Sequence, residues 1–170
     1  MANDNVNIGI VGLGFMAVMH IRAYRQVEGA NIAAICNPSG NRLNGDFSDV
    51  FGNLDSGDPV KLDMSQVKAY QSFDELLADD SIDVIDICAP TRTHVELTKA
   101  ALAAGKHVLC EKPLARTLDD AREIADAAAN AKGLFMTAMC LRFWPQWAWL
   151  KEAVASGRYG KVLGAHFQRI

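Results

Sequence analysis

The sequence lacks long hydrophobic runs, blocks of basic residues and internal repeats, and each absence excludes a class of protein. The apolar stretch near the amino terminus is interrupted by Gly9, Gly12 and Gly14, and no basic segment precedes it, so we expect neither a signal peptide nor a membrane span. The net charge is −3 with Lys and Arg dispersed, which argues against a nucleic acid or an anionic membrane as partner. There is no fixed repeat and no low-complexity tract.

Paired cysteines are also missing, because no two of the four form a Cys-x-x-Cys motif. They are Cys36, Cys88, Cys110 and Cys140. This spacing is typical of reduced thiols in a cytoplasmic protein. Three of them end predicted strands, but a zinc site would need ligand-pair spacing, so we interpret them as small buried hydrophobes and expect no metal.

Hydrophobic residues are 50% of the 170 and charged residues 22%, an ordinary globular composition with enough chain for a sizeable core. Short apolar runs alternate with helical patterns, which favours parallel βα units. The predicted strands cover residues 6–11, 31–36, 67–71, 83–88, 107–110 and 134–138.

Helices are predicted between these strands, over residues 15–27, 42–50 and 73–78. Capping sequences at Ser72, Thr93 and Thr117 open helices, of which the last two end at Gly105 and Gly133. Six strands with helical crossovers match both halves of a dinucleotide-binding sheet. We therefore predict an α/β fold with a doubly wound Rossmann parallel sheet in the order 3-2-1-4-5-6.

The first βα turn carries a G-x-G-x-x-A sequence directly after an apolar strand. Gly12 would permit the tight turn, Gly14 would let the backbone approach a pyrophosphate, and Ala17 would allow the helix to pack closely on the strand. The amino terminus of that helix supplies N–H groups and positive dipole to phosphates. The alternative is a purely structural glycine turn. The predicted cofactor-binding residues here are Gly12, Leu13, Gly14, Phe15 and Met16.

The end of the second strand departs from the usual dinucleotide pattern, because Asn37 stands where Asp or Glu would bind the ribose. Asparagine can bond a ribose hydroxyl but does not repel a 2′-phosphate, and Ser39 and Arg42 are near enough in sequence to bind one. The other interpretation is a simple turn with Arg42 in solvent. We expect NAD or NADP, with a slight preference for NADP.

Two further segments end predicted strands where an open parallel sheet binds ligands. Pro90 ends the fourth strand and leaves the backbone of Ala89, Pro90 and Thr91 near the expected nicotinamide ribose, while His94 either faces that crevice or simply packs. After the fifth strand, Glu111 and Lys112 form a candidate proton-transfer pair, or else a solvated charged turn.

The carboxyl-terminal part has a different pattern from the sheet. Residues 144–155 have helical apolar spacing that includes Trp144 and Trp147, which we interpret as packing, and residues 161–170 predict a strand. A lone strand has an unpaired edge, so it could pair with a second copy of the chain. We expect a cofactor-binding domain over residues 1–141 and the truncated start of a second, α+β domain over 142–170.

Together these segments resemble the glucose–fructose oxidoreductase / inositol 2-dehydrogenase (Gfo/Idh/MocA) family. The matching pieces are the glycine loop at 12–17 and the stretches 89–94, 104–115, 141–145 and 156–162. The resemblance implies an NAD(P)-dependent oxidoreductase acting on a sugar, cyclitol or related polyol. It implies that Lys112 orients the substrate hydroxyl and assists proton transfer, with Glu111 beside it at the nicotinamide, and that His94 and Arg142 approach the cofactor.

The resemblance also implies a second, mostly antiparallel domain that supplies the substrate pocket, and this sequence contains at most its beginning. Activity of the 170 residues alone is therefore open. The alternative function is a non-catalytic dinucleotide-binding or sensing module that acts through a partner.

Overall fold

The computed structural model describes residues 5–52 and 58–168. Internal contacts divide the chain into two compact units, Met1–Ala138 and Met139–Ile170, and each is described by itself. Across the described residues, no helix combines the length and apolar character that crossing a bilayer requires. The assignment of the second unit as the start of a further domain stays a prediction.

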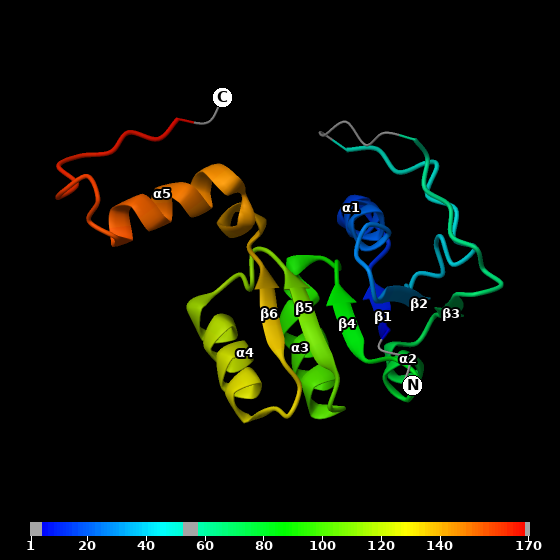
Figure 1. Cartoon of the computed structure of the whole chain (residues 1–170). Helices are drawn as coiled ribbons and strands as arrows, with labels where there is room; N and C mark the ends of the chain where they lie inside the picture. The colour runs from blue at the N-terminus through cyan, green and yellow to red at the C-terminus, as the bar shows by residue number, and fades with distance from the viewer. Residues whose placement is uncertain (1–4, 53–57, 169–170) are drawn as a thin grey trace. The chain divides into compact units, whose positions relative to one another are not determined.

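The first unit is built on one six-stranded parallel sheet (Figure 1). Its strand order is β3-β2-β1-β4-β5-β6, which confirms the predicted order 3-2-1-4-5-6. The change of direction between β1 and β4 is the position at which such sheets bind ligands. The strands are β1 (Val6–Val11), β2 (Ala30–Cys36), β3 (Lys68–Tyr70), β4 (Val84–Ile87), β5 (His107–Glu111) and β6 (Phe135–Ala138).

Four α-helices connect these strands. They are α1 (Phe15–Tyr24), α2 (Phe73–Leu77), α3 (His94–Ala103) and α4 (Leu118–Asn130), with a 3₁₀ turn, η1 (Thr91–Thr93), before α3. The predicted caps of α2 and α4 are present, because the hydroxyls of Ser72 and Thr117 accept backbone N–H bonds from their first turns. Thr93 does precede the first residue of α3, as predicted, but the side-chain cap expected there is absent. The Thr93 hydroxyl donates to the Pro90 carbonyl at 2.8 Å instead, since η1 runs directly into α3.

Two hydrophobic cores lie on opposite faces of the sheet. On one face, Ile21 of α1 packs with Ile10 and Ile35 of the central strands, all fully buried. On the other face, Ile85 and Leu102 belong to a cluster formed by α2, α3 and α4. Each such side chain contributes about 1.5–3 kcal/mol by leaving water, so the two cores fix the carboxyl ends of β1, β4 and β5 relative to α1.

The predicted helix over residues 42–50 is wrong, because the described chain forms turns there. Asp46 accepts hydrogen bonds from both the backbone N–H and the hydroxyl of Ser48, and Arg42 adopts a positive φ of 60°. Asp, Asn and Ser side chains that bond nearby backbone groups compete with the helical ladder. α1 is also shorter than predicted and ends at Tyr24.

The second unit contains a 3₁₀ turn, η2 (Cys140–Phe143), and a helix, α5 (Pro145–Ala155). Pro145 stands in the first turn of α5, where its missing N–H costs no helical hydrogen bond. The predicted strand over 161–170 is wrong for residues 161–168, which carry no strand, and residues 169–170 lie outside the described residues. A strand exists only with a hydrogen-bonded neighbour, so pairing of two copies through this segment stays a prediction.

Candidate dinucleotide-binding site

The glycine loop between β1 and α1 uses its two glycines for different purposes. Gly12 has a φ of +85°, and a Cβ there would lie 2.6 Å from the Ala89 Cα, so turn and packing both require glycine. Gly14 has an extended conformation, with φ −97° and ψ −163°, and no atom lies within 4 Å of where its Cβ would be. Neither conformation nor packing therefore demands glycine at position 14.

The open space at Gly14 lies where α1 begins, and this helix end has no side-chain cap and no acidic residue in its first turn. N–H groups at such an end need an acceptor, and they favour an anion. The side chain of Leu13 is buried and those of Phe15 and Met16 are half-buried, so mainly their backbones face a ligand. The loop fits a pyrophosphate.

The segment after β2 forms a compact polar turn. The Asn37 side chain accepts from the Ser39 N–H and hydroxyl and donates to the Asn41 carbonyl at 2.9 Å. Arg42 reaches the glycine loop, donating to the Leu13 carbonyl at 3.3 Å. The segment therefore forms a turn, as one of the two interpretations expects, but Arg42 is not free in solvent, and binding of a ribose by Asn37 and Ser39 stays a prediction.

The Arg42 guanidinium forms an ion pair with the Asp49 carboxylate. Its Nε and one Nη donate to the two carboxylate oxygens of Asp49 at 2.9 and 2.7 Å. The hydrogen bonds from Arg42 hold the pKa of the Asp49 carboxyl below its ordinary value. The positive charge of Arg42 is thus paired with a carboxylate.

His94 joins the loops that follow β4 and β5. Its ring is buried, with Nδ1 3.0 Å from the Pro113 carbonyl and Nε2 2.9 Å from the Ala89 carbonyl. Both ring nitrogens are thus directed at backbone oxygens, and His94 holds Ala89, Pro90 and Thr91 next to the segment after β5. We interpret it as a positioning residue for these loops, and its contact with a cofactor stays a prediction.

The carboxylate of Glu111 does not pair with the ammonium of Lys112, which corrects the view of the two as an adjacent acid and base. Glu111 is 5% exposed, and its Oε2 accepts the backbone N–H of Lys112 at 2.8 Å. The Lys112 side chain is exposed at the end of β5, and within 5–52 and 58–168 its ammonium has no ion-pair partner. The Lys112–Pro113 peptide bond is cis.

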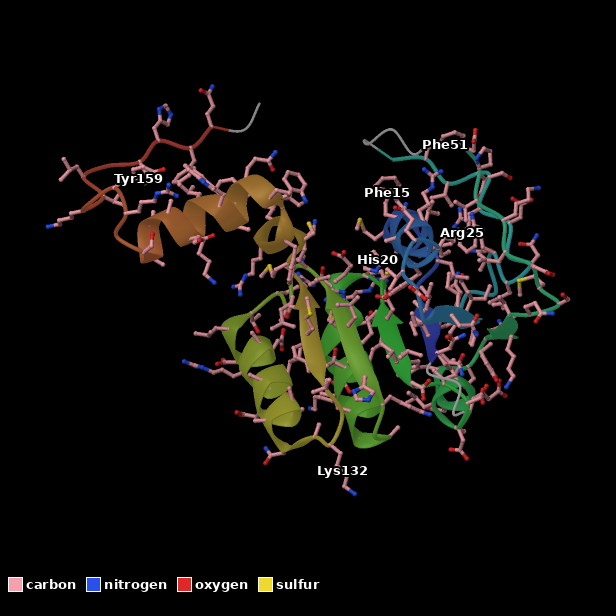
Figure 2. The ribbon with its side chains drawn as sticks, viewed as in Figure 1. Phe15, His20, Arg25, Phe51, Lys132 and Tyr159 are labelled. Carbon is pink, nitrogen blue, oxygen red and sulfur yellow. The ribbon has the colours of Figure 1, made fainter. Side chains whose placement is uncertain are left out.

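Sequence reasoning missed the partner of Glu111, which is His20 on α1 (Figure 2). The His20 ring lies between two carboxylates, with Nε2 3.1 Å from Glu111 Oε1 and Nδ1 2.7 Å from Asp86 Oδ2. The Tyr24 hydroxyl also donates to Asp86 Oδ2, at 2.9 Å. An available signal was Asp86 itself, since a carboxylate inside an otherwise apolar central strand needs a buried partner.

Burial and hydrogen bonding act in opposite directions on this cluster. Burial lowers the pKa of His20, but hydrogen bonds to Asp86, Cys88 and Glu111 outweigh it and raise the pKa to about 12. Burial raises the pKa of Glu111, but the bonds from His20 and from the Lys112 N–H hold it below its ordinary value. Burial chiefly raises the pKa of the Cys88 thiol. Both shifts favour a protonated His20 ring beside an ionised Glu111.

Arg142 is the one predicted site residue outside the first unit. It lies on η2 of the second unit and is exposed. Its approach to a cofactor stays a prediction.

Comparisons with known proteins match this architecture. A family model described as "Oxidoreductase family, NAD-binding Rossmann fold" (GFO_IDH_MocA) matches residues 6–139. A myo-inositol 2-dehydrogenase of Thermotoga maritima is 31% identical, over 92% of this chain and 42% of the relative. A levoglucosan dehydrogenase of Pseudarthrobacter phenanthrenivorans is 29% identical, over 94% of this chain and 40% of the relative.

A solved structure with the same arrangement is an oxidoreductase from Agrobacterium radiobacter in complex with NAD+, L-tartaric acid and magnesium. It has a TM-score of 0.75 and 28% identity, and the match covers 92% of this chain and 42% of that one. The chain thus spans about two fifths of the length of the relatives it matches.

Proposed function

We propose that this chain, which belongs to the Gfo/Idh/MocA oxidoreductase family, is the cofactor-binding part of an NAD(P)-dependent dehydrogenase for a sugar, cyclitol or related polyol. The observation that carries the proposal is the open space at Gly14, in front of the uncapped amino terminus of α1. It lies at the change of direction between β1 and β4, where dinucleotides bind in such sheets. The names of the relatives supply the substrate class.

The proposed cofactor position follows from this loop. The pyrophosphate would accept N–H bonds at Gly14, Phe15 and Met16, and the adenosine ribose would lie at Asn37 and Ser39. The nicotinamide ribose would then face the backbone of Ala89, Pro90 and Thr91, which His94 holds in place. When bound, the nicotinamide accepts or donates the hydride.

Lys112 is the group of this chain best suited to the accompanying proton. Its exposed ammonium follows β5 at the ligand-binding edge of the sheet, while its backbone is held by Glu111. A hydride leaves a carbinol carbon more readily as the hydroxyl proton is removed, and an amine within reach of that hydroxyl can take it. We therefore assign proton transfer and orientation of the substrate hydroxyl to Lys112.

Replacing Lys112 with alanine is expected to lower turnover about 10²- to 10⁴-fold, because the proton acceptor is lost. The dissociation constant for NADH should change less than about threefold, because the phosphate-binding loop is untouched. Turnover is measured with inositols and levoglucosan as the polyol set, first on the 170-residue protein and then with any downstream segment joined to it. Lys132→Ala is the matched control, since that exposed lysine precedes β6, at the amino ends of the strands, whereas Lys112 follows the carboxyl end of β5 (Figure 2).

Unchanged turnover in Lys112→Ala would contradict the assigned role. Cofactor binding with no turnover in every length tested would instead favour a non-catalytic dinucleotide-binding or sensing module.

The choice between NAD and NADP depends on the polar turn after β2. Asn37 carries no charge to repel a 2′-phosphate, but the Asp49 carboxylate already occupies Arg42. These two features oppose each other, so we propose that the site accepts both cofactors. The slight preference for NADP expected from the sequence loses one of its supports, because that expectation treated Arg42 as available.

Asp49→Asn is expected to tighten NADPH binding about five- to tenfold and to leave NADH binding within about twofold, because a released guanidinium can pair with the 2′-phosphate. Titration of both reduced cofactors, followed by nicotinamide fluorescence, measures the two constants. Asp63→Asn is the matched control, because Asp63 binds Ser65 in a similar turn and carries no arginine. Equal changes for NADH and NADPH in Asp49→Asn would exclude a role for Arg42 in selecting the phosphate.

A further inference from the structure

A buried chain of hydrogen bonds runs from α1 through β4 and β5 to the backbone of Lys112. Asp86 is fully buried and Glu111 is 5% exposed, and the His20 ring connects them. Ionised carboxylates only accept hydrogen bonds, so a ring that bonds both must donate from both nitrogens. His20 is thus the cation of the cluster.

The other polar groups that face His20 do not replace this bridge. The Tyr24 hydroxyl bonds Asp86 alone, and the Cys88 thiol lies 3.5 Å from His20 Nδ1. Two buried carboxylates without a cation between them repel each other and are poorly solvated. Without His20, the Glu111 carboxyl would either take up a proton or turn toward water, and either change would weaken its bond to the Lys112 N–H.

We propose that His20 is a positioning residue for Lys112: by bridging Asp86 and Glu111 it holds the Glu111 carboxylate against the Lys112 N–H and so fixes the lysine at the end of β5. The inference rests on the proposed function, in which Lys112 handles the substrate proton. Helix α1 would then contribute to the site twice, through its amino terminus at the glycine loop and through His20.

The same cluster invites a competing assignment as a metal site. Ligand atoms of His20, Asp86 and Cys88 lie within 4.8 Å of one another. Each ring nitrogen of His20 already bonds a carboxylate oxygen, at 2.7 Å to Asp86 and 3.1 Å to Glu111, and a metal ion at these ligands would have to replace the bond to Asp86. The hydrogen-bond geometry therefore favours the ion-pair bridge. Zinc titration separates the two assignments.

The test uses nitrogen NMR on the labelled 170-residue protein and needs neither cofactor nor turnover. In the wild-type protein at pH 8, both ring nitrogens of His20 should give protonated, donor-type signals, with the exposed His166 as internal reference. His20→Asn should speed hydrogen exchange at the Lys112 amide about 10- to 100-fold relative to the amides within β4 and β5, as expected for loss of a charge-assisted bond.

Tyr24→Phe is the matched control, because it removes one hydrogen bond to Asp86 but leaves the bridge to Glu111. Exchange at Lys112 should then change less than about threefold. A neutral His20 ring, an unchanged Lys112 amide in His20→Asn, or stoichiometric zinc binding that replaces a ring proton would each overturn the proposal. If His20→Asn does not fold, the wild-type ring signals and the zinc titration still decide it.

These outcomes are independent of the proposed function. Failure of the protein to bind NADH would remove the proposed function and leave the His20 bridge intact. A broken bridge in a protein that binds NADH would remove only this inference.

Discussion

Replacing Gly14 with tryptophan is expected to abolish detectable binding of NADH and NADPH while the protein stays folded. Position 14 has an extended conformation that any residue adopts, and its Cβ direction is open, so the fold tolerates the side chain. The indole would fill the space assigned to the pyrophosphate. We expect binding to weaken more than about 100-fold, which corresponds to about 2.7 kcal/mol. Calorimetric titration measures the binding, and urea unfolding measures the stability.

The control for this prediction is Gly164→Trp, which adds the same side chain in the second unit, where nothing lies within 4 Å of the Cβ direction. It should leave binding unchanged. The free energy of unfolding of Gly14→Trp should lie within about 1 kcal/mol of the wild-type value, as for most surface substitutions. Retained NADH binding in a folded Gly14→Trp protein would contradict the assignment of the loop.

Gly12→Ala is expected to act on the fold itself. A φ of +85° costs a residue with a Cβ about 1–2 kcal/mol, and the added methyl would lie 2.6 Å from the Ala89 Cα, where backbone must move. We expect a total loss of about 3–5 kcal/mol in the free energy of unfolding, which is a large share of the stability of a small domain. The measurement is urea unfolding followed by circular dichroism.

Gly14→Ala is the matched substitution for that experiment, because it adds the same methyl two residues away without strain or collision. It should change stability by less than about 1 kcal/mol. Similar losses in the two variants would mean that the turn at Gly12 is less constrained than its contacts with Ala89 indicate.

Local patterns were sufficient to predict most of the sheet. The apolar runs and the glycine loop are properties of consecutive residues, and short parallel βα units leave few topologies open, so the strand order was correct. Family resemblance contributed the substrate class and the role of Lys112. Both sources agree on the cofactor loop.

The two errors in secondary structure have different causes. Residues near Arg42 have helical spacing, but Asp and Ser side chains bond their own backbone and form turns. Residues 161–168 have strand-like composition, but they have no strand beside them in the described residues.

The polar cluster was missed for a third reason. His20 and Asp86 are separated by 66 positions, and neither belongs to a recognisable motif. Glu111 does belong to one, and its adjacency to Lys112 suggested a pair of side chains. Alternation along a strand sends neighbouring side chains to opposite faces, so the carboxylate turns to α1 and only the backbone of Lys112 meets it. The partner of a buried polar residue is therefore found from the three-dimensional structure, not from its neighbours in the sequence.

The most direct test of the account is a titration of the intact 170-residue protein with NADH, with Gly14→Trp in parallel. We expect saturable binding of one NADH per chain with a dissociation constant between about 1 μM and 1 mM, and no saturation in Gly14→Trp. A folded wild-type protein that shows no saturable binding, or equal binding by the two proteins, would contradict the claim that this sheet and its glycine loop form a dinucleotide site.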